Sequence, residues 1–210
     1  MRKLVLATRN QGKTEEMRTI LKASGIEGRF QIDSLLSYPN LPGIAEDGAT
    51  FSENAEKKAV TVARFTGHIA VADDSGLEVD ALEGAPGIYS ARFAGDGAAD
   101  SENIKKLLSL LTRVPFEKRT ARFVCVIALA MPDGVVSTVR GECPGIISTE
   151  ERGTSGFGYD PVFIVPAYDK TFAELGSDIK NKISHRAIAL GKLCELLKII
   201  VDGFDKKAFL

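Results

Sequence analysis

A long apolar run, residues 120–131, constrains the fold of this chain more than any other segment. Almost all of its side chains are apolar at odd and even positions alike, so a strand built from it would bury both faces. Pro132-Asp133-Gly134 follows with good turn chemistry and leads into a second predicted strand, residues 135–143. A chain of 210 residues that is 44% hydrophobic has enough apolar surface to cover such a strand on both sides. We therefore expect a β-sheet with helices packed against it.

Helix and strand signals alternate along the rest of the chain. Helical spacing of apolar residues, capping residues and short apolar runs bounded by turns locate these elements. The predicted helices cover residues 12–23, 50–63, 100–111 and 184–200; the predicted strands cover residues 3–8, 30–35, 69–72, 120–131, 135–143 and 162–165, with 144–149 continuing the fifth after a bend. Crossover helices together with a hairpin predict an α/β fold with a mixed sheet, in a single domain over residues 1–210.

Charge and cysteine content limit the function classes. The net charge is −1, so there is no basic excess of the kind that binds a nucleic-acid backbone. No apolar stretch is long enough to cross a membrane, and the short run near the N-terminus is better explained as a first strand than as a signal peptide. Cys125, Cys143 and Cys194 have neither metal-ligand nor disulfide spacing, and the first and last lie in apolar, core-like segments. We expect a cytoplasmic protein without nucleic-acid or membrane partners.

Two adjacent carboxylates, Asp73 and Asp74, follow the apolar run 68–72. Burying such a pair is costly unless a positive group lies against it, and Mg²⁺ takes carboxylate oxygens while leaving positions for phosphate and water. If the strand continues, the two side chains point to opposite faces and cannot have the same role. The alternative is a turn, because Asp-Asp-Ser-Gly is good turn chemistry.

The segment Thr8-Arg9-Asn10-Gln11-Gly12-Lys13 lies between a predicted strand and a predicted helix. Amides at a helix N-terminus bind anions, and Lys13 adds a positive charge, so this loop is a candidate phosphate site. A relaxed P-loop is a competing interpretation, with Thr14 on the metal, but Ala7 replaces the first glycine and Gly12 is the only glycine in the loop. A plain strand–helix turn is the third possibility.

Two further clusters are candidates for base recognition. Ser184-His185-Arg186 opens the last predicted helix, and Lys180 and Lys182 precede it, which suits a negative or electron-rich ligand. Aromatic residues, Phe157 and Tyr159, stand in a glycine-rich loop and offer a ring for stacking. A surface basic cluster and ordinary loop packing are the alternatives.

Taken together and in order, these segments resemble the inosine triphosphatase family, also called XTP/dITP diphosphatases. The resemblance covers nearly the whole chain and rests on Thr8-x-Asn10-x-x-Lys13-x-x-Glu16, Glu46-Asp47-Gly48-Ala49-Thr50-Phe51-x-Glu53-Asn54-Ala55, Ala72-Asp73-Asp74-Ser75-Gly76-Leu77, Gly84-Ala85-Pro86-Gly87-Ile88-Tyr89-Ser90-Ala91-Arg92-Phe93, Gly156-Phe157-Gly158-Tyr159-Asp160-Pro161 and Ser184-His185-Arg186. Arg9 falls where many members carry glycine.

The resemblance implies a fold, an assembly and an activity. The fold is two-lobed α/β around a long twisted mixed sheet with flanking helices, with the active site in the cleft between the lobes. The assembly is a homodimer. The activity is Mg²⁺-dependent cleavage of ITP, dITP and XTP between the α and β phosphorus atoms, which gives a monophosphate and pyrophosphate and removes deaminated purines from the nucleotide pool.

The resemblance also assigns residue roles. Asp74 is the proton acceptor for the attacking water, and the metal ligands are Asp74, Glu46 and Asp73, although the roles of Asp73 and Asp74 could be exchanged. Phe157 stacks on the base, and donors such as His185 and Arg186 favour a 6-oxo purine. The full set of expected substrate-binding residues is Thr8, Arg9, Asn10, Gln11, Gly12, Lys13, Ser75, Phe157, Gly158, Tyr159, Asp160, Lys180, His185 and Arg186. Rival functions are a pyrophosphatase for other modified nucleotides, a P-loop NTPase, and a nucleotide sensor without turnover.

Overall fold

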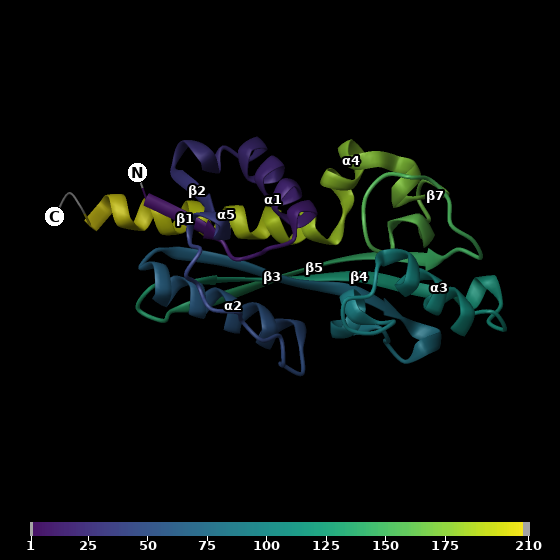
Figure 1. The fold of residues 1–210 in the computed structure, drawn as a ribbon. Helices are drawn as coiled ribbons and strands as arrows, with labels where there is room; N and C mark the ends of the chain where they lie inside the picture. The colour runs from purple at the N-terminus through teal and green to yellow at the C-terminus, as the bar shows by residue number, and fades with distance from the viewer. Residues whose placement is uncertain (1, 208–210) are drawn as a thin grey trace. The chain divides into compact units, whose positions relative to one another are not determined.

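The chain alternates strands and helices and forms a mixed α/β fold, as predicted (Figure 1). The computed structural model describes residues 2–207, together with their side chains except those of 27, 201 and 203–207. Among these residues seven strands form one sheet in the order β2-β1-β3-β4-β5-β6-β7. The strands are β1 (Arg2–Leu6), β2 (Phe30–Ser34), β3 (Ile69–Val79), β4 (Thr120–Ala130), β5 (Val136–Ile147), β6 (Phe163–Val165) and β7 (Lys170–Thr171). The helices are α1 (Gln11–Ala23), α2 (Phe51–Thr66), α3 (Asp100–Leu110), α4 (Phe172–Ile183) and α5 (His185–Lys207).

The chain divides into two compact units. Within the described residues, unit 1 comprises 2–74, 126–141 and 186–207, and unit 2 comprises 75–125 and 142–185. Strands β3, β4 and β5 contribute residues to both units. That the chain is one two-lobed domain with its site in a cleft stays a prediction.

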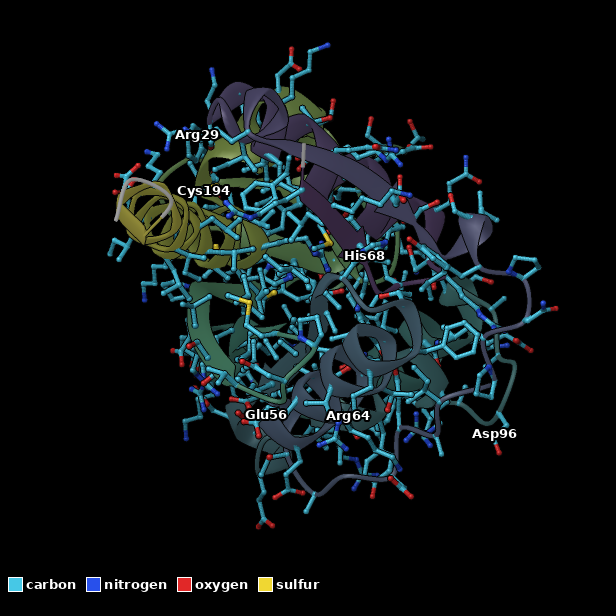
Figure 2. All side chains as sticks on the ribbon, turned by 90° about the vertical axis from the view of Figure 1, so that its left-hand side faces the viewer. Arg29, Glu56, Arg64, His68, Asp96 and Cys194 are labelled. Carbon is cyan, nitrogen blue, oxygen red and sulfur yellow. The ribbon has the colours of Figure 1, made fainter. Side chains whose placement is uncertain are left out.

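Unit 1 is built on three parallel strands. β1 pairs in parallel with β2 on one side and with β3 on the other, and Leu4, Val5 and Leu6 of β1 are completely buried. Helices α1 and α5 cover one face of these strands and α2 covers the other, which explains why the strands are apolar on both faces (Figure 1). The predicted core cysteine of α5, Cys194, is buried in this unit (Figure 2).

Local sequence signals set the ends of the unit 1 helices. The side chain of Asn10 accepts a hydrogen bond from the Lys13 amide at the start of α1, and Thr50 does the same for the Glu53 amide at the start of α2. α2 ends at Gly67, whose φ of 69° suits a residue without a Cβ atom. The predicted hairpin is also confirmed, since the Met131 amide donates to the Val135 carbonyl at 2.8 Å and the Gly134 amide donates to the Met131 carbonyl at 3.0 Å.

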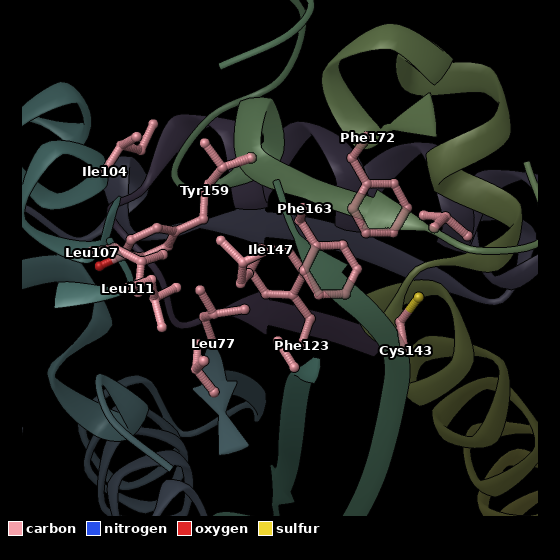
Figure 3. Close-up of a cluster of buried hydrophobic side chains, with 14 residues drawn as sticks. Leu77, Ile104, Leu107, Leu111, Phe123, Cys143, Ile147, Tyr159, Phe163 and Phe172 are labelled. Atoms are coloured by element: carbon pink, nitrogen blue, oxygen red, sulfur yellow. The ribbon is translucent and has the colours of Figure 1, made fainter. Parts of the chain in front are cut away.

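Unit 2 has an aromatic core (Figure 3). The rings of Phe123 and Phe163 lie 4.5 Å apart between centroids, and Phe163 stacks on Phe172 at 5.4 Å. Gly145 of β5 faces this cluster, where a Cβ atom would collide with the Phe163 ring. β5 pairs antiparallel with β6, and β6 pairs antiparallel with β7.

Three sequence predictions need correction. The strand predicted at 69–72 is too short, because β3 continues to Val79, and this excludes the alternative of a turn at residues 73–76. The strand predicted at 162–165 begins one residue later, since Asp160–Val162 form a 3₁₀ turn. Helix α4 was not predicted, although Thr171 and Glu174 form a capping box at its start. Gly176, with a φ of 75°, interrupts α4 and weakens its helical pattern.

In the part of the chain that the structure describes, no helix combines the length and apolar character needed to cross a membrane.

Candidate active site

The two adjacent aspartates of β3 point to opposite faces of the sheet. Asp73 contacts side chains from α1 and α5, whereas Asp74 contacts side chains from α2, the helix on the other face. This separation follows from the alternation of side chains along a strand. The prediction that the two carboxylates cannot share one role is therefore supported by their different partners.

Asp73 is at the centre of a buried charge network. Its Oδ2 atom lies 3.0 Å from Lys13 Nζ and 3.4 Å from Arg186 Nη2, and the Asp73 side chain is completely buried. Arg186 is 2% exposed and also pairs with Glu16 of α1 through Nη1. The charges alternate in sign along the chain of contacts from Lys13 through Asp73 and Arg186 to Glu16. The buried carboxylate of Asp73 is therefore compensated by protein cations rather than by water.

The network sets the ionisation of Asp73. Burial alone would raise its pKa, but the charges of Lys13, Arg186 and Lys58 outweigh burial and hold the pKa of Asp73 well below its ordinary value. Asp73 is therefore ionised throughout the physiological range and is a poor proton acceptor.

This depressed pKa predicts acid lability. A carboxyl group whose pKa is lower in the folded than in the unfolded state stabilises the fold above its unfolded pKa of about 4 and loses that contribution as pH falls below it. We expect melting temperatures measured from about pH 6 down to about pH 2 to fall on the acid side. Asp73→Asn should have a lower melting temperature at about pH 6, and its melting temperature should fall less steeply toward about pH 2. Parallel limbs for the two proteins would contradict the assignment.

Asp74 has a different environment, supplied by α2. Its Oδ2 accepts a hydrogen bond from Asn54 Nδ2 at 3.1 Å, and its Oδ1 lies 3.3 Å from Lys58 Nζ. Asn54 and Lys58 are four residues apart, so they lie on the same face of the helix. Asn54 is itself fixed, since its Oδ1 accepts from the Gly48 amide at 2.8 Å, and a Cβ atom at Gly48 would meet that oxygen.

The pKa of Asp74 is shifted in the direction opposite to that of Asp73. Burial raises it, the charges of Lys58 and Lys13 lower it only in part, and the neighbouring Glu46 raises it again. Two adjacent carboxyl groups with oppositely shifted pKa values are the pattern expected when only one of them accepts a proton. Asp74 is the more basic of the pair.

Glu46 and Asp74 are the best candidates for a metal site. Glu46 Oε1 lies 2.7 Å from the same Lys58 Nζ that contacts Asp74, so the two carboxylates already hold one cation between them. Carboxylate oxygens are ligands that a hard divalent cation prefers, and these two carboxylates lie close to one cationic atom. Within residues 2–207 no three His, Cys, Asp or Glu side chains gather closely enough to hold a metal. The predicted three-residue metal set, which includes Asp73, stays a prediction.

The predicted phosphate loop precedes α1 as expected. The Asn10 amide donates to Thr8 Oγ1 at 3.2 Å, and α1 has no acidic residue in its first turn to compete with an anion. Lys13 is on this turn, beside Asp73. Arg9 Nη2 donates to the Leu41 carbonyl at 3.4 Å, a contact with a residue 32 positions away. Gln11 contacts Glu15 on the next turn of α1, and Gly12 lies in the first turn of that helix.

Unit 2 contains most of the residues predicted to bind the base, whereas Arg186 belongs to unit 1. Lys180 Nζ lies 2.6 Å from Asp160 Oδ2 and 4.3 Å from the centre of the Phe157 ring. The same Asp160 oxygen accepts from the Phe157 amide at 3.0 Å, and Gly156 leaves room for it, because a Cβ atom there would clash with that carboxylate. The charge of Lys180, a predicted substrate-binding residue, is matched by Asp160 inside unit 2.

Four other predicted residues are placed as follows. His185, at the start of α5, stacks on Phe123 with the ring centroids 4.7 Å apart. The Gly158 amide donates to Asp100 Oδ2 at 2.6 Å, and Tyr159 lies in the buried core of unit 2. Ser75 directly follows Asp74 on β3.

Some site residues were not singled out from the sequence. Lys58 and Asn54 are buried polar side chains on the otherwise apolar face of α2, and this departure from the pattern is a signal that could have found them. Glu16 and Asn54 appeared only as parts of the motifs that carry the family resemblance, and Lys58 did not appear at all. The pairing of Glu16 with Arg186, 170 residues away, has no local signal.

Known proteins resemble this chain over nearly its whole length. The Ham1 family profile matches residues 4–196. A "dITP/XTP pyrophosphatase" of Desulforamulus reducens is 55% identical over 195 residues, 93% of this chain and 95% of that protein. One of Exiguobacterium sibiricum is 50% identical over 191 residues, 91% of this chain and 94% of that protein.

Solved structures of Ham1 proteins resemble this chain in sequence and in fold. A HAM1 protein from Coxiella burnetii has 42% identity and a TM-score of 0.85, covering 94% of this chain and 99% of that one. The Ham1 protein of Staphylococcus aureus has 40% identity and a TM-score of 0.83, covering 94% and 98%. The family resemblance and the mixed α/β fold predicted from the sequence are both confirmed, and this chain belongs to the Ham1 family.

Proposed function

We propose that this protein is a dITP/XTP pyrophosphatase, which hydrolyses deaminated purine nucleoside triphosphates such as dITP, XTP and ITP to the monophosphate and pyrophosphate. Relatives with about half of their residues identical carry the name dITP/XTP pyrophosphatase. The observation that carries the proposal is the pair Asp73 and Asp74, adjacent residues of one strand whose carboxylates are held by different partners: Lys13 and Arg186 contact Asp73, and Asn54 and Lys58 contact Asp74. The opposite directions of their pKa shifts agree with this difference. Such a pair suits hydrolysis, in which one carboxylate takes a proton while another holds positive charge in place.

The triphosphate is bound, in this proposal, at the start of α1. Lys13 supplies positive charge, and the amides of the first turn supply hydrogen-bond donors to an anion. Asp73 and Glu16, through Lys13 and Arg186, hold the cations of this region in fixed positions. Fixed charges stabilise a transition state better than mobile ones because they need no reorganisation.

Asp74 accepts the proton of the attacking water. Its raised pKa makes it a stronger base than an exposed aspartate. Asn54 orients one oxygen by donating a hydrogen bond, which leaves the other oxygen toward Lys58. Lys58 keeps Glu46 and Asp74 together despite their like charge.

Mg²⁺ is the proposed cofactor, and Glu46 and Asp74 would hold it, because they already share a cation. When bound, it would neutralise phosphate charge and acidify the attacking water.

Base recognition is assigned to unit 2. The Phe157 ring is proposed to stack on the purine, and Lys180, 4.3 Å from the centre of that ring, brings a positive charge beside it. Lys180, Asp160 and His185 supply polar atoms, and a donor aimed at position 6 favours an oxo over an amino group. Arg186 engages Glu16 and Asp73, which favours a role in holding Asp73 rather than the predicted role in reading the base. A homodimer and a cytoplasmic location are further parts of the proposal.

The decisive experiment is a substrate panel. Pyrophosphate release is measured from ITP, XTP, dITP, ATP, GTP and dUTP, each with Mg²⁺ and with EDTA. We expect strong, Mg²⁺-dependent release from ITP, XTP and dITP and little from the others. Orthophosphate release from ATP would indicate a P-loop-type NTPase instead. Preference for dUTP would indicate a different modified-nucleotide pyrophosphatase, and no turnover with any substrate would favour a sensor.

A further inference from the structure

Tyr159 is enclosed in the core of unit 2 rather than presented to a ligand. Its side chain lies among Ile104, Leu107 and Leu111, and the residue is 4% exposed (Figure 3). One polar atom, the phenol oxygen, remains to be satisfied, and it donates to the Ser90 carbonyl at 2.9 Å. Burial, together with the charge of Asp100, raises the pKa of Tyr159, so the phenol keeps its proton and remains a donor.

Ser90, the acceptor residue, is itself fixed by two hydrogen bonds. It belongs to the 3₁₀ segment Gly87–Arg92 and is 8% exposed. Its Oγ donates to the Gly87 carbonyl at 2.6 Å and accepts from the Leu77 amide of β3 at 2.9 Å. The residue whose carbonyl Tyr159 binds is therefore joined to strand β3 by a hydrogen bond.

The loop that contains Tyr159 needs such an anchor. Residues 155–161, here called the base loop, include Gly156 and Gly158, both with positive φ, so the backbone itself restricts the loop little. The neighbours of Tyr159 in this loop are Phe157 and Asp160, the proposed base-binding residues. Three further contacts hold this loop: Asp100 accepts from the Gly158 amide, Lys180 pairs with Asp160, and the Arg152 amide donates to the Pro161 carbonyl. Among these ties, that of Tyr159 joins the loop to the segment Gly87–Arg92.

We propose that Tyr159 is a positioning residue: its hydrogen bond to the Ser90 carbonyl fixes the base loop to β3, and thereby sets affinity and selectivity for the purine base. This inference rests on the proposed function. Tyr159 was predicted to contact the substrate, whereas this inference gives it the role of positioning the residues that do. The phenol hydroxyl supplies the positioning hydrogen bond, and the ring packs in the core.

Tyr159→Phe tests the inference because it keeps the ring and removes only the hydroxyl group. The buried Ser90 carbonyl then loses its partner, and the loop loses its fixed point. We expect KM for dITP and XTP to rise by about tenfold, kcat to stay within about twofold, and discrimination against GTP to narrow. A purely structural role would lower the melting temperature without separating KM from kcat.

Tyr38→Phe is the matched control. It also removes a phenol hydroxyl that makes a hydrogen bond, to Asp33 at 3.2 Å, but in a part of unit 1 that has no proposed role in the site. Its KM and kcat should equal those of the unmodified protein. Equal KM values for Tyr159→Phe and Tyr38→Phe would overturn the inference.

A second variant and a second measurement distinguish failure of the proposed function from failure of the anchoring role of Tyr159. Ser90→Ala removes the hydroxyl that fixes the acceptor, so it should raise KM in the same way, and the double variant should be less than additive. Amide hydrogen exchange over residues 155–161 should be faster in both single variants than in Tyr38→Phe. Lack of dITP and XTP hydrolysis by the unmodified protein would refute the proposed function, whereas unchanged exchange in Tyr159→Phe would refute the anchoring role alone.

Discussion

Asp74→Asn is expected to lower kcat for dITP and XTP by at least about 100-fold without lowering the melting temperature. The amide has nearly the shape of the carboxylate and can still accept from Asn54, but it cannot take a proton from water. Burial raises the pKa of Asp74, which means that the folded protein holds this group in its charged form at a cost. A neutral side chain removes that cost, so stability should be unchanged or higher while turnover is lost.

Asp47→Asn is the control for this substitution. Asp47 lies beside Glu46 in the sequence, but its side chain is 69% exposed and pairs with Lys57 at the surface. Steady-state kinetics should give a kcat within about twofold of the unmodified protein for Asp47→Asn. A folded Asp74→Asn protein with near-normal kcat would exclude Asp74 as the base, and loss of turnover in Asp73→Asn alone would exchange the two roles.

The fold was largely readable from the sequence because its elements carry local signals. Asn10 and Thr50 cap helices that begin within one residue of the predicted positions, and the Pro132-Asp133-Gly134 turn joins β4 to β5. The extent of β3 was not readable in the same way. Its polar segment matches a turn locally, and only ion pairs from helices remote in sequence make Asp73 and Asp74 tolerable inside a strand.

The sequence supplies a list of candidate site residues, which stays a prediction, but it does not show how these residues pair. Asp74, Lys13 and Glu46 carry types of side chain that suggest their chemistry. That Lys58 joins Glu46 to Asp74, or that Lys180 faces Asp160, depends on tertiary contacts without a periodic pattern. Arg186 is the clearest example, since a helix-start arginine suggested a ligand, and its guanidinium is instead buried between two carboxylates.

Arg186→Ala is expected to destabilise the protein by about 3–5 kcal/mol, because removing one member of a buried ion network leaves its partners charged and uncompensated. Glu16 would lose its partner on α5. Asp73, which is completely buried, would lose its ion pair with Arg186 and keep its ion pair with Lys13. In a chain of this size the melting temperature should fall by about 10 °C. In the protein that remains folded, KM should rise and kcat should fall, because Lys13 would be attracted more strongly to Asp73 and less available to the substrate.

The exposed arginine Arg29 provides the matched control (Figure 2). It pairs with Asp202 at 2.9 Å, but the two side chains are 46% and 63% exposed, and such pairs contribute at most about 1 kcal/mol. Arg29→Ala should therefore shift the melting temperature by no more than about 3 °C. If Arg186→Ala lowered the melting temperature by no more than Arg29→Ala, the buried network would not stabilise the fold.

The double variant Arg186→Ala with Asp73→Asn tests whether the lost stability comes from uncompensated charge. Neutralising the carboxylate that the arginine compensates should recover part of the lost stability, whereas simple loss of packing would make the second substitution additive.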